Sequence, residues 1–365
     1  MNDKFNIENE DNMEKEKKSK IKKILVNLTI FILLIILTFS LVLKDQDVSQ
    51  IFSVAAKVKK QYILFAVLAM SIYILGEAVN ITRILKELGE KSKLISNIRY
   101  TLIGFFFSAI TPAASGGQPM EIYYMHKDDI SVANSTLALL MQLCSLQIVT
   151  ITVGIISAVI HFEVLKSGLI YLLILGIILN SSALMLLIIA IFSKRLSEGL
   201  IKFVVKLLKF FRIPNVEKLE KELESYQTSA KYIKEHKILM LKTVITTVVQ
   251  MIAYYSVPYW IYLAFGLTEY NIFEILTLQA VLYATVSGIP SPGAVGVSEG
   301  GFLGIFKNVF PETIISSAML LTRGANFYLF IIISAIIVMI STFREKRIEK
   351  KQMQETEVLT EKSEK

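Results

Sequence analysis

The stretch SGIPSPGAVGVSEGGFLG, residues 287–304, decides how this chain can fold. It holds six of the 17 glycines and two of the seven prolines, and apolar runs lie on both sides of it. Pro290 and Pro292 remove backbone donors and fix φ, so no regular helix can run through them. The stretch also carries one carboxylate, Glu299. Irregular backbone at membrane depth must be buried in protein or line a wet cavity, and a carboxylate there predicts a functional site.

A second stretch, SAITPAASGGQPME at residues 108–121, resembles the first. Both run Ser-x-Ile, then proline, then glycine, then glutamate, and the spacing from Pro112 to Gly116 equals that from Pro292 to Gly296. Two broken segments at corresponding places in two halves of a chain predict a transporter-like binding site. The alternative is that both are plain Gly/Pro loops between helices and are alike by chance.

Composition places the chain among membrane proteins with several spans. Of its 365 residues, 53% are hydrophobic, and the mean hydropathy is +0.56. The single cysteine, Cys144, permits no internal disulfide, and the three histidines share no metal-ligand spacing. The sequence contains no zinc motif, P-loop or dinucleotide fingerprint. We therefore expect no cofactor, no metal and no nucleic-acid partner, and we interpret the net charge of +8 as a signal of membrane topology.

Apolar runs of about one bilayer thickness predict an all-α polytopic helix bundle with about six full spans. These runs are 24–43, 62–82, 133–160, 165–192, 238–265 and 313–340. The membrane domain then covers 24–343, between charged tails at 1–23 and 344–365 that we expect to be disordered. Residues 193–237 form a polar insert within it, whose two amphipathic helices are predicted to lie on the membrane surface or to pack on a partner.

The distribution of basic residues predicts the orientation of the chain. Of its 39 Lys and Arg residues, 31 lie in the four segments 1–23, 83–99, 193–242 and 343–365. Because basic loops stay on the cytosolic side, both termini and the insert are predicted to be cytosolic in a multi-pass protein of the cell membrane. The linker 44–60, which also carries basic residues, fits this assignment least well.

This orientation constrains the two broken stretches. Only one full crossing, 133–160, fits between the inner loop 83–99 and the outer turn 161–166. Segment 100–120 must then enter and leave on the cytosolic side. The same count of crossings between loops of predicted side requires segment 270–310 to enter and leave on the outer side. The prediction is two re-entrant hairpins from opposite faces in a pseudo-inverted repeat, with their sites meeting near the midplane.

Ionisable residues in or beside the spans are the first candidates for a polar path: Glu77, Arg83, Glu121, Glu299 and Arg323. A buried charge must be paired or hydrated, so charges of opposite sign should lie close together. Arg323 could hold a phosphate by a bidentate contact, and the carboxylates could receive a cationic headgroup or carry protons. The alternative is that Glu299 and Arg323 form a structural ion pair only.

The remaining candidates come from the two broken stretches and the last span. They are Ser115, Gly116, Gly117, Gln118, Pro290, Pro292, Gly293, Gly296 and Asn326. Backbone amides of residues 116–118 are predicted to be free after Pro112, and free amides favour anions. A helix-breaking turn without a ligand is the alternative.

The motifs TPAASGGQPMEIYYM and SGIPSPGAVGVSEGGF resemble the paired motifs of the lysylphosphatidylglycerol synthase transmembrane family. This is the flippase-like membrane domain of proteins of the multiple-peptide-resistance-factor type. The resemblance covers about residues 20–343, and Arg323 matches the family's last-helix arginine. It implies a role in lipid metabolism and antibiotic resistance. In that role the domain moves phospholipid between leaflets, for example aminoacylated phosphatidylglycerol or another anionic lipid.

Full-length members of that family join this domain to a cytosolic domain that transfers lysine from lysyl-tRNA onto phosphatidylglycerol. The tail 344–365 is too short to form such a domain. We therefore expect no catalytic residues here. The alternatives to a flippase are a phosphatidylglycerol lysyltransferase that needs a further domain and a membrane scaffold that recruits a partner. Expected partners are membrane phospholipids, a separate lipid synthase or glycosyltransferase, and further copies of the chain in an oligomer.

The predicted topology can be tested by labelling intact cells. A cysteine introduced next to Asn215 should not react with a membrane-impermeant maleimide, because the 193–237 insert is predicted to be cytosolic. Reaction from outside would contradict the assignment of every basic loop.

Overall fold

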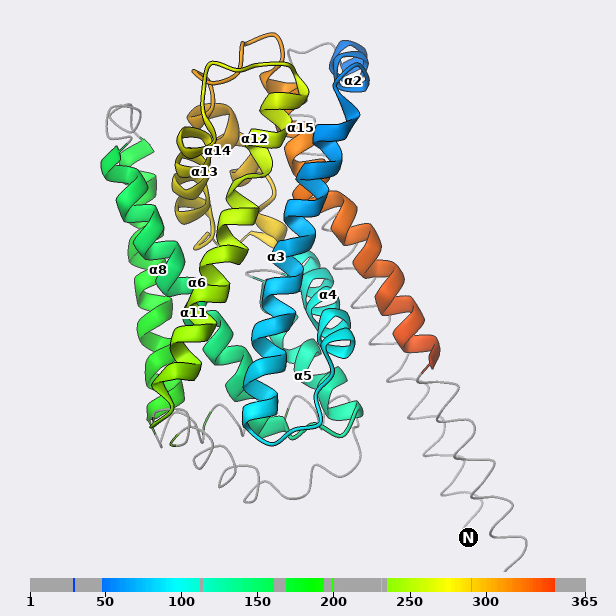
Figure 1. The fold of residues 1–365 in the computed structure, drawn as a ribbon, viewed down its shortest axis with the longest axis vertical. Helices are drawn as coiled ribbons and strands as arrows, with labels where there is room; N and C mark the ends of the chain where they lie inside the picture. Colours follow the sequence, from blue (N-terminus) through cyan, green and yellow to red (C-terminus); the bar gives the residue numbers. More distant parts are fainter. Residues whose placement is uncertain are drawn as a thin grey trace, which may run out of the picture.

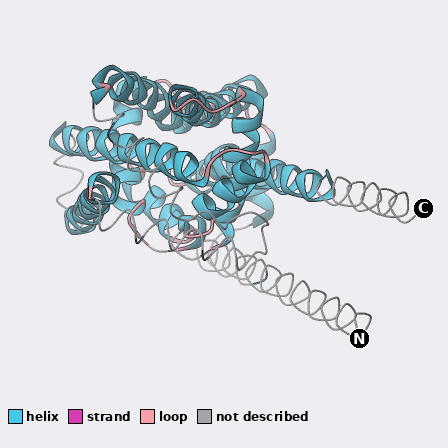
Figure 2. Cartoon of the chain, turned by 90° about the horizontal axis from the view of Figure 1, so that it is seen from below, coloured by secondary structure: helices cyan, strands magenta, loops and turns pink. Residues whose placement is uncertain are grey.

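The computed structural model describes residues 48–111, 114–160, 169–193, 235–289 and 291–344, together with the single positions 29, 199, 206 and 231. All regular structure among these residues is helical, as the sequence predicts (Figure 2). The predicted span 24–43, nearly all of both charged tails and most of the insert lie outside the described residues.

Five segments among the described residues are long and apolar enough to cross a membrane. They are α3 (Lys60–Glu87), α6 (Val132–Ile160), α8 (Leu169–Phe192), α11 (Lys237–Tyr255) continued by α12 (Val257–Ala264), and Ile315–Arg344, which begins with α15 (Ile315–Arg323). Each corresponds to a predicted span. Large apolar side chains such as Leu64, Ile178 and Ile336 are exposed on them, as expected of a surface that faces lipid. The chain is a multi-pass helical membrane protein.

Two of these spans contain a local irregularity. In the fourth, α11 ends at Tyr255 and α12 begins at Val257, with Pro258 in its first turn, where a missing backbone donor is tolerated. In the last span, α15 is followed by the π-helical turn η3 (Gly324–Tyr328). Single π turns inside helices occur frequently at functional sites.

Two shorter helix pairs turn back inside the bundle. Helices α4 (Leu94–Ile110) and α5 (Gly117–Lys127) form one pair, and α13 (Ile272–Val286) and α14 (Val297–Ile305) form the other. In Figure 1, α4 and α5 lie in the lower half of the molecule and α13 and α14 in the upper half, with each pair open toward its own end. That these pairs are re-entrant hairpins from opposite faces of a membrane stays a prediction.

The turns of the two hairpins share one unusual feature. Ala114 and Ala294, each two positions after the proline of its motif, have φ of 53° and 52°. Non-glycine residues rarely adopt positive φ, and such strain concentrates at functional sites. The two turns therefore share one strained alanine at the same offset, whereas the glycines four positions after each proline differ, with φ of −89° at Gly116 and 85° at Gly296. That the two stretches are a structural repeat stays a prediction.

Each hairpin belongs to its own apolar core. One core forms around α4, α5 and the first half of α6, with Ile103 and Met141 fully buried. The other forms around α12, α13, α14 and α15, where the stacked rings of Phe302 and Phe306 have centroids 4.5 Å apart. The two cores leave the tips of the hairpins facing each other near the middle of the bundle.

Candidate functional site

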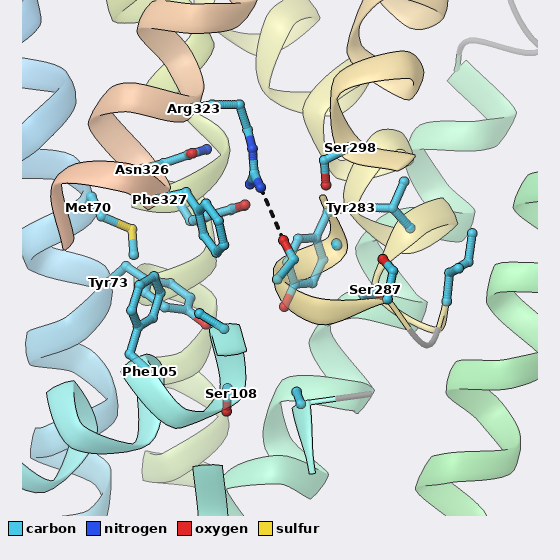
Figure 3. A pocket seen from close by; sticks show the side chains of 18 of the residues that line it. Met70, Tyr73, Phe105, Ser108, Tyr283, Ser287, Ser298, Arg323, Asn326 and Phe327 are labelled. Carbon is cyan, nitrogen blue, oxygen red and sulfur yellow. Dashed lines mark hydrogen bonds between the residues drawn. The ribbon is translucent and has the colours of Figure 1, made fainter. Parts of the chain in front are cut away.

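A cavity of about 290 Å³ lies between the tips of the two hairpins (Figure 3). Helix α4 contributes Phe105 and Ser108, and the turn of the other hairpin contributes Gly293 and Ser298. Arg323 reaches the cavity from the last span, as the close-up shows. The cavity is therefore built from both halves of the chain.

Arg323 forms a buried ion pair with Glu299. Its Nε donates to Glu299 Oε1 at 2.8 Å, and the two side chains are 8% and 0% exposed. Tyr328 OH also donates to Oε1 at 3.1 Å, and the backbone N–H of Gly296 donates to Oε2 at 2.7 Å. The expectation that opposite charges lie close together is confirmed for this pair.

The ion pair leaves part of the Arg323 guanidinium facing the cavity. Nη2 donates to the carbonyl of Gly293 at 3.1 Å, the bond drawn as a dashed line in Figure 3, and the guanidinium carbon lies 4.0 Å from the ring centroid of Phe327. Among the described residues these contacts and the bond to Glu299 use two of its N–H groups. The others can be donated to an acceptor in the cavity.

Glycine is required in the turn beside Arg323. Gly293 has φ of 59° and Gly296 has φ of 85°, both in the region that favours glycine. A Cβ at Gly293 would lie 2.2 Å from the ring of Phe327. The turn can therefore bring its backbone against the guanidinium and the aromatic ring only because a side chain is missing at this position.

Several buried polar atoms around the cavity have no hydrogen-bond partner among the described residues. They include Asn326 Oδ1, Ser291 Oγ, Thr322 Oγ1 and Gln279 Oε1. Gln279, Thr322 and Asn326 also line a small adjoining cavity of about 20 Å³. Buried polar groups are costly unless bonded, so this region is arranged to bond water or the polar part of a ligand.

The structure gathers the predicted residues of the second stretch and the last span. Gly293, Arg323 and Asn326 line the cavity, while Glu299 and Gly296 lie directly behind them through the bonds given above. Pro292 begins the 3-10 turn η2 (Pro292–Ala294). Pro290 lies outside the described residues.

The predicted residues of the first stretch are arranged differently. Ser115 is exposed at the tip, and Gln118 is half-buried in the first turn of α5. The N–H of Gly116 donates to Thr111 Oγ1 at 2.9 Å, so this amide is already used within the hairpin and is not free for an anion. Gly117 packs against Ser108, because a Cβ there would lie 2.0 Å from its hydroxyl.

Three further predicted residues lie on the α4–α5 side of the cavity. Glu77 is half-buried on α3, one turn from Tyr73, which lines the cavity. Glu121 is buried on α5. Arg83 is farther along α3, where its Nη1 donates to Asn80 Oδ1 at 3.0 Å and its Nη2 to Thr246 Oγ1 at 3.1 Å.

An aromatic cluster at the cavity was not among the predicted site residues. Tyr73, Tyr254 and Tyr283 line the cavity, with ring centroids 5.2 Å apart for Tyr73 and Tyr254 and 5.3 Å apart for Tyr254 and Tyr283. One signal was present in the sequence, since Tyr73 and Glu77 are four residues apart and share one helical face. The other two tyrosines come from different helices, and nothing local in the sequence links them.

Comparison with known proteins agrees with this architecture. A family model described as the lysylphosphatidylglycerol synthase TM region matches residues 24–334. A UPF0104 membrane protein of Archaeoglobus fulgidus is 23% identical over 276 residues, which cover 71% of this chain and 80% of that protein. The family match includes both hairpins, Glu299 and Arg323.

The ion pair predicts an unusual stability pattern. Glu299→Gln and Arg323→Gln should each lower the yield and thermal stability of the protein in detergent, because each leaves one buried charge without its partner, at a cost of about 3–5 kcal/mol. The double variant should recover most of the loss. Glu312→Gln, at an exposed position, is the control and should behave like the parent. A double variant no more stable than either single one would contradict the pairing.

Proposed function

We propose that this chain, which belongs to the lysylphosphatidylglycerol synthase TM-region family, moves phospholipid between the two leaflets of the membrane, with the cavity between its hairpins as the headgroup site. The observation that carries the proposal is the buried Arg323, which is fixed by Glu299 and still borders the cavity with unused N–H groups. A charged residue inside a membrane domain is costly and usually functional. A planar guanidinium also binds phosphate bidentately, so a lipid phosphate fits this position.

The size and walls of the cavity suit a headgroup rather than a whole lipid. Its volume of about 290 Å³ lies at the lower end of the roughly 300–1,000 Å³ that is usual for ligand pockets. Its walls combine apolar groups such as Met70 and Phe105 with the hydroxyls of Ser108 and Ser298. Acyl chains would remain among the exposed apolar side chains of the spans while the headgroup occupies the cavity.

The two hairpins provide a route for alternating access. Each hairpin closes the cavity toward its own end of the bundle, since α4 and α5 open downward and α13 and α14 open upward in Figure 1. Rocking of one half against the other around a fixed central site is the usual behaviour of inverted repeats. The π-helical turn 324–328, next to Arg323, is a suitable place for the last span to bend.

The transported lipid would be anionic, because the exposed part of the site is a guanidinium. An aminoacylated phosphatidylglycerol, which is not anionic overall, would offer the same phosphate to the guanidinium beside its cationic amino group. We further propose that a separate lipid synthase or glycosyltransferase makes or uses the lipid. An oligomer of this chain is also part of the proposal.

Lipid movement can be measured with the purified chain in liposomes. A tail-labelled anionic phospholipid and an impermeant quencher should report faster exchange between leaflets than in protein-free vesicles. Asn326→Ala, which removes a cavity group outside the ion pair, should slow exchange several-fold. Arg323→Lys should slow it by roughly 10-fold or more, since a charged hydrogen bond contributes about 1.5–3 kcal/mol. Glu312→Gln is the control. Normal exchange in both cavity variants would remove the cavity from the path, and no exchange in the parent would contradict the function.

The alternative function, lipid aminoacylation, predicts a different outcome. Expressed in a host that lacks any such synthase, this chain should produce no lysylphosphatidylglycerol, because the cavity lining described here has an arginine, serines and tyrosines but no histidine, cysteine or carboxylate to act as nucleophile or base. Detection of that lipid by mass spectrometry in the host would support the alternative instead.

A further inference from the structure

A second buried glutamate, Glu121, is not part of the cavity lining and has no role in the function proposed above. Glu121, on α5, is 2% exposed, and its Oε2 has no hydrogen-bond partner among the described residues. The carboxylate lies against the backbone of α4 at Gly104, where a Cβ would lie 2.0 Å from Oε1 and 2.5 Å from Cδ. The absent side chain at Gly104 therefore makes the space that this carboxylate occupies.

The charge that acts on Glu121 comes from another acidic residue. This is Glu77 of α3, which is half-buried. From the elements packed around them, Tyr73 and Tyr283 face Glu77, and Cys144 is the titratable side chain of α6. None of these groups supplies a positive charge.

The arginines on the surrounding elements are engaged elsewhere. Among the described residues, Arg83 donates to Asn80 and Thr246, Arg99 donates to Asp128, and Arg323 donates to Glu299. Lys60, Lys86 and Arg344 are exposed at helix ends, and His126 and Lys127 are at the far end of α5. Lys237 and Lys242 of α11 are exposed as well. Among the described residues, Glu121 is thus buried without a counter-ion.

Glu121 and Glu299 end the same sequence motif in the two halves of the chain, but their surroundings differ. Glu299 accepts hydrogen bonds from Arg323, Tyr328 and the Gly296 backbone. The Oε2 atom of Glu121 accepts none from the described residues. Burial without a cation or a donor favours the neutral form of a carboxyl group.

We propose that Glu121 is a proton-binding site, in which its buried carboxyl group holds a proton, and that this proton is taken up and released during lipid movement. Binding converts the carboxylate to a carboxylic acid and involves no other bond. The coupling to transport rests on the function proposed above, while the proton site itself does not. At alkaline pH the site would lose its proton, leaving a buried charge without a partner against α4 and weakening the packing of the α4–α5 hairpin.

Infrared difference spectroscopy tests the proton site directly. The purified full chain in lipid should show the carbonyl stretch of a protonated carboxylic acid at neutral pH, and this band should be lost in Glu121→Gln. Glu77→Gln should keep the band but lose it at a lower pH, because the repelling neighbour is gone. Gly104→Ala, which displaces the Glu121 carboxylate without changing its charge, should shift the band.

The control is Glu312→Gln, which removes a glutamate at an exposed position. This variant should leave the band unchanged. Absence of the band in the parent protein, or its persistence in Glu121→Gln, would overturn the proton site.

Coupling is tested in the same liposomes as lipid movement, with a pH gradient and a trapped pH-sensitive dye. Lipid exchange in the parent should change several-fold with the gradient and be accompanied by proton movement, and both responses should be lost in Glu121→Gln. A rate of lipid exchange that does not change with the pH gradient would overturn the coupling while leaving the proposed function intact. No exchange at all would contradict the function, and the infrared band would still decide the proton site.

Discussion

Irregular backbone within a membrane domain needs hydrogen-bond partners from the protein itself, and in this chain the Glu299–Arg323 pair provides them. The Glu299 carboxylate accepts the N–H of Gly296, and the Arg323 guanidinium donates to the carbonyl of Gly293, so the pair bonds the backbone on both sides of the turn. Because each charge also neutralises the other, the turn of the α13–α14 hairpin, the position of the last span and one wall of the cavity all depend on a single buried interaction.

A purely structural pair would explain the hairpin but not its surroundings. The guanidinium has more donors than the turn uses, and it borders a cavity where Asn326 and Ser291 also hold unpartnered polar atoms. A strained alanine, Ala294, is maintained in the same turn. Natural structures seldom keep strain and unbonded polar groups in one place without a function, so the structural role of Arg323 is compatible with the binding role proposed for it.

The sequence predicts what depends on short stretches of chain, and it misses what depends on packing between distant ones. Hydropathy locates the five described spans, the Pro-Gly spacing locates both hairpin turns, and the cost of an isolated charge predicts that Glu299 and Arg323 meet. The sequence did not predict that the Gly116 N–H donates to Thr111 Oγ1, because this bond depends on the local conformation of the turn. The tyrosine cluster depends on how α3, α11 and α13 face one another, which no local pattern records.

The two halves share a fold but differ in how each treats its motif glutamate, and this difference has a mechanical consequence. The two turns share a strained alanine, Ala114 and Ala294, but the corresponding glycines differ, with φ of −89° at Gly116 and 85° at Gly296. In one half Arg323 neutralises the Glu299 carboxylate and joins that hairpin to the last span. In the other half Glu121 lies against α4 without a cation among the described residues, and at the proton site proposed above the packing of that hairpin would depend on an exchangeable proton. If one hairpin moves against the rest during transport, the α4–α5 hairpin is the one whose contacts can be released without stranding an arginine in the membrane.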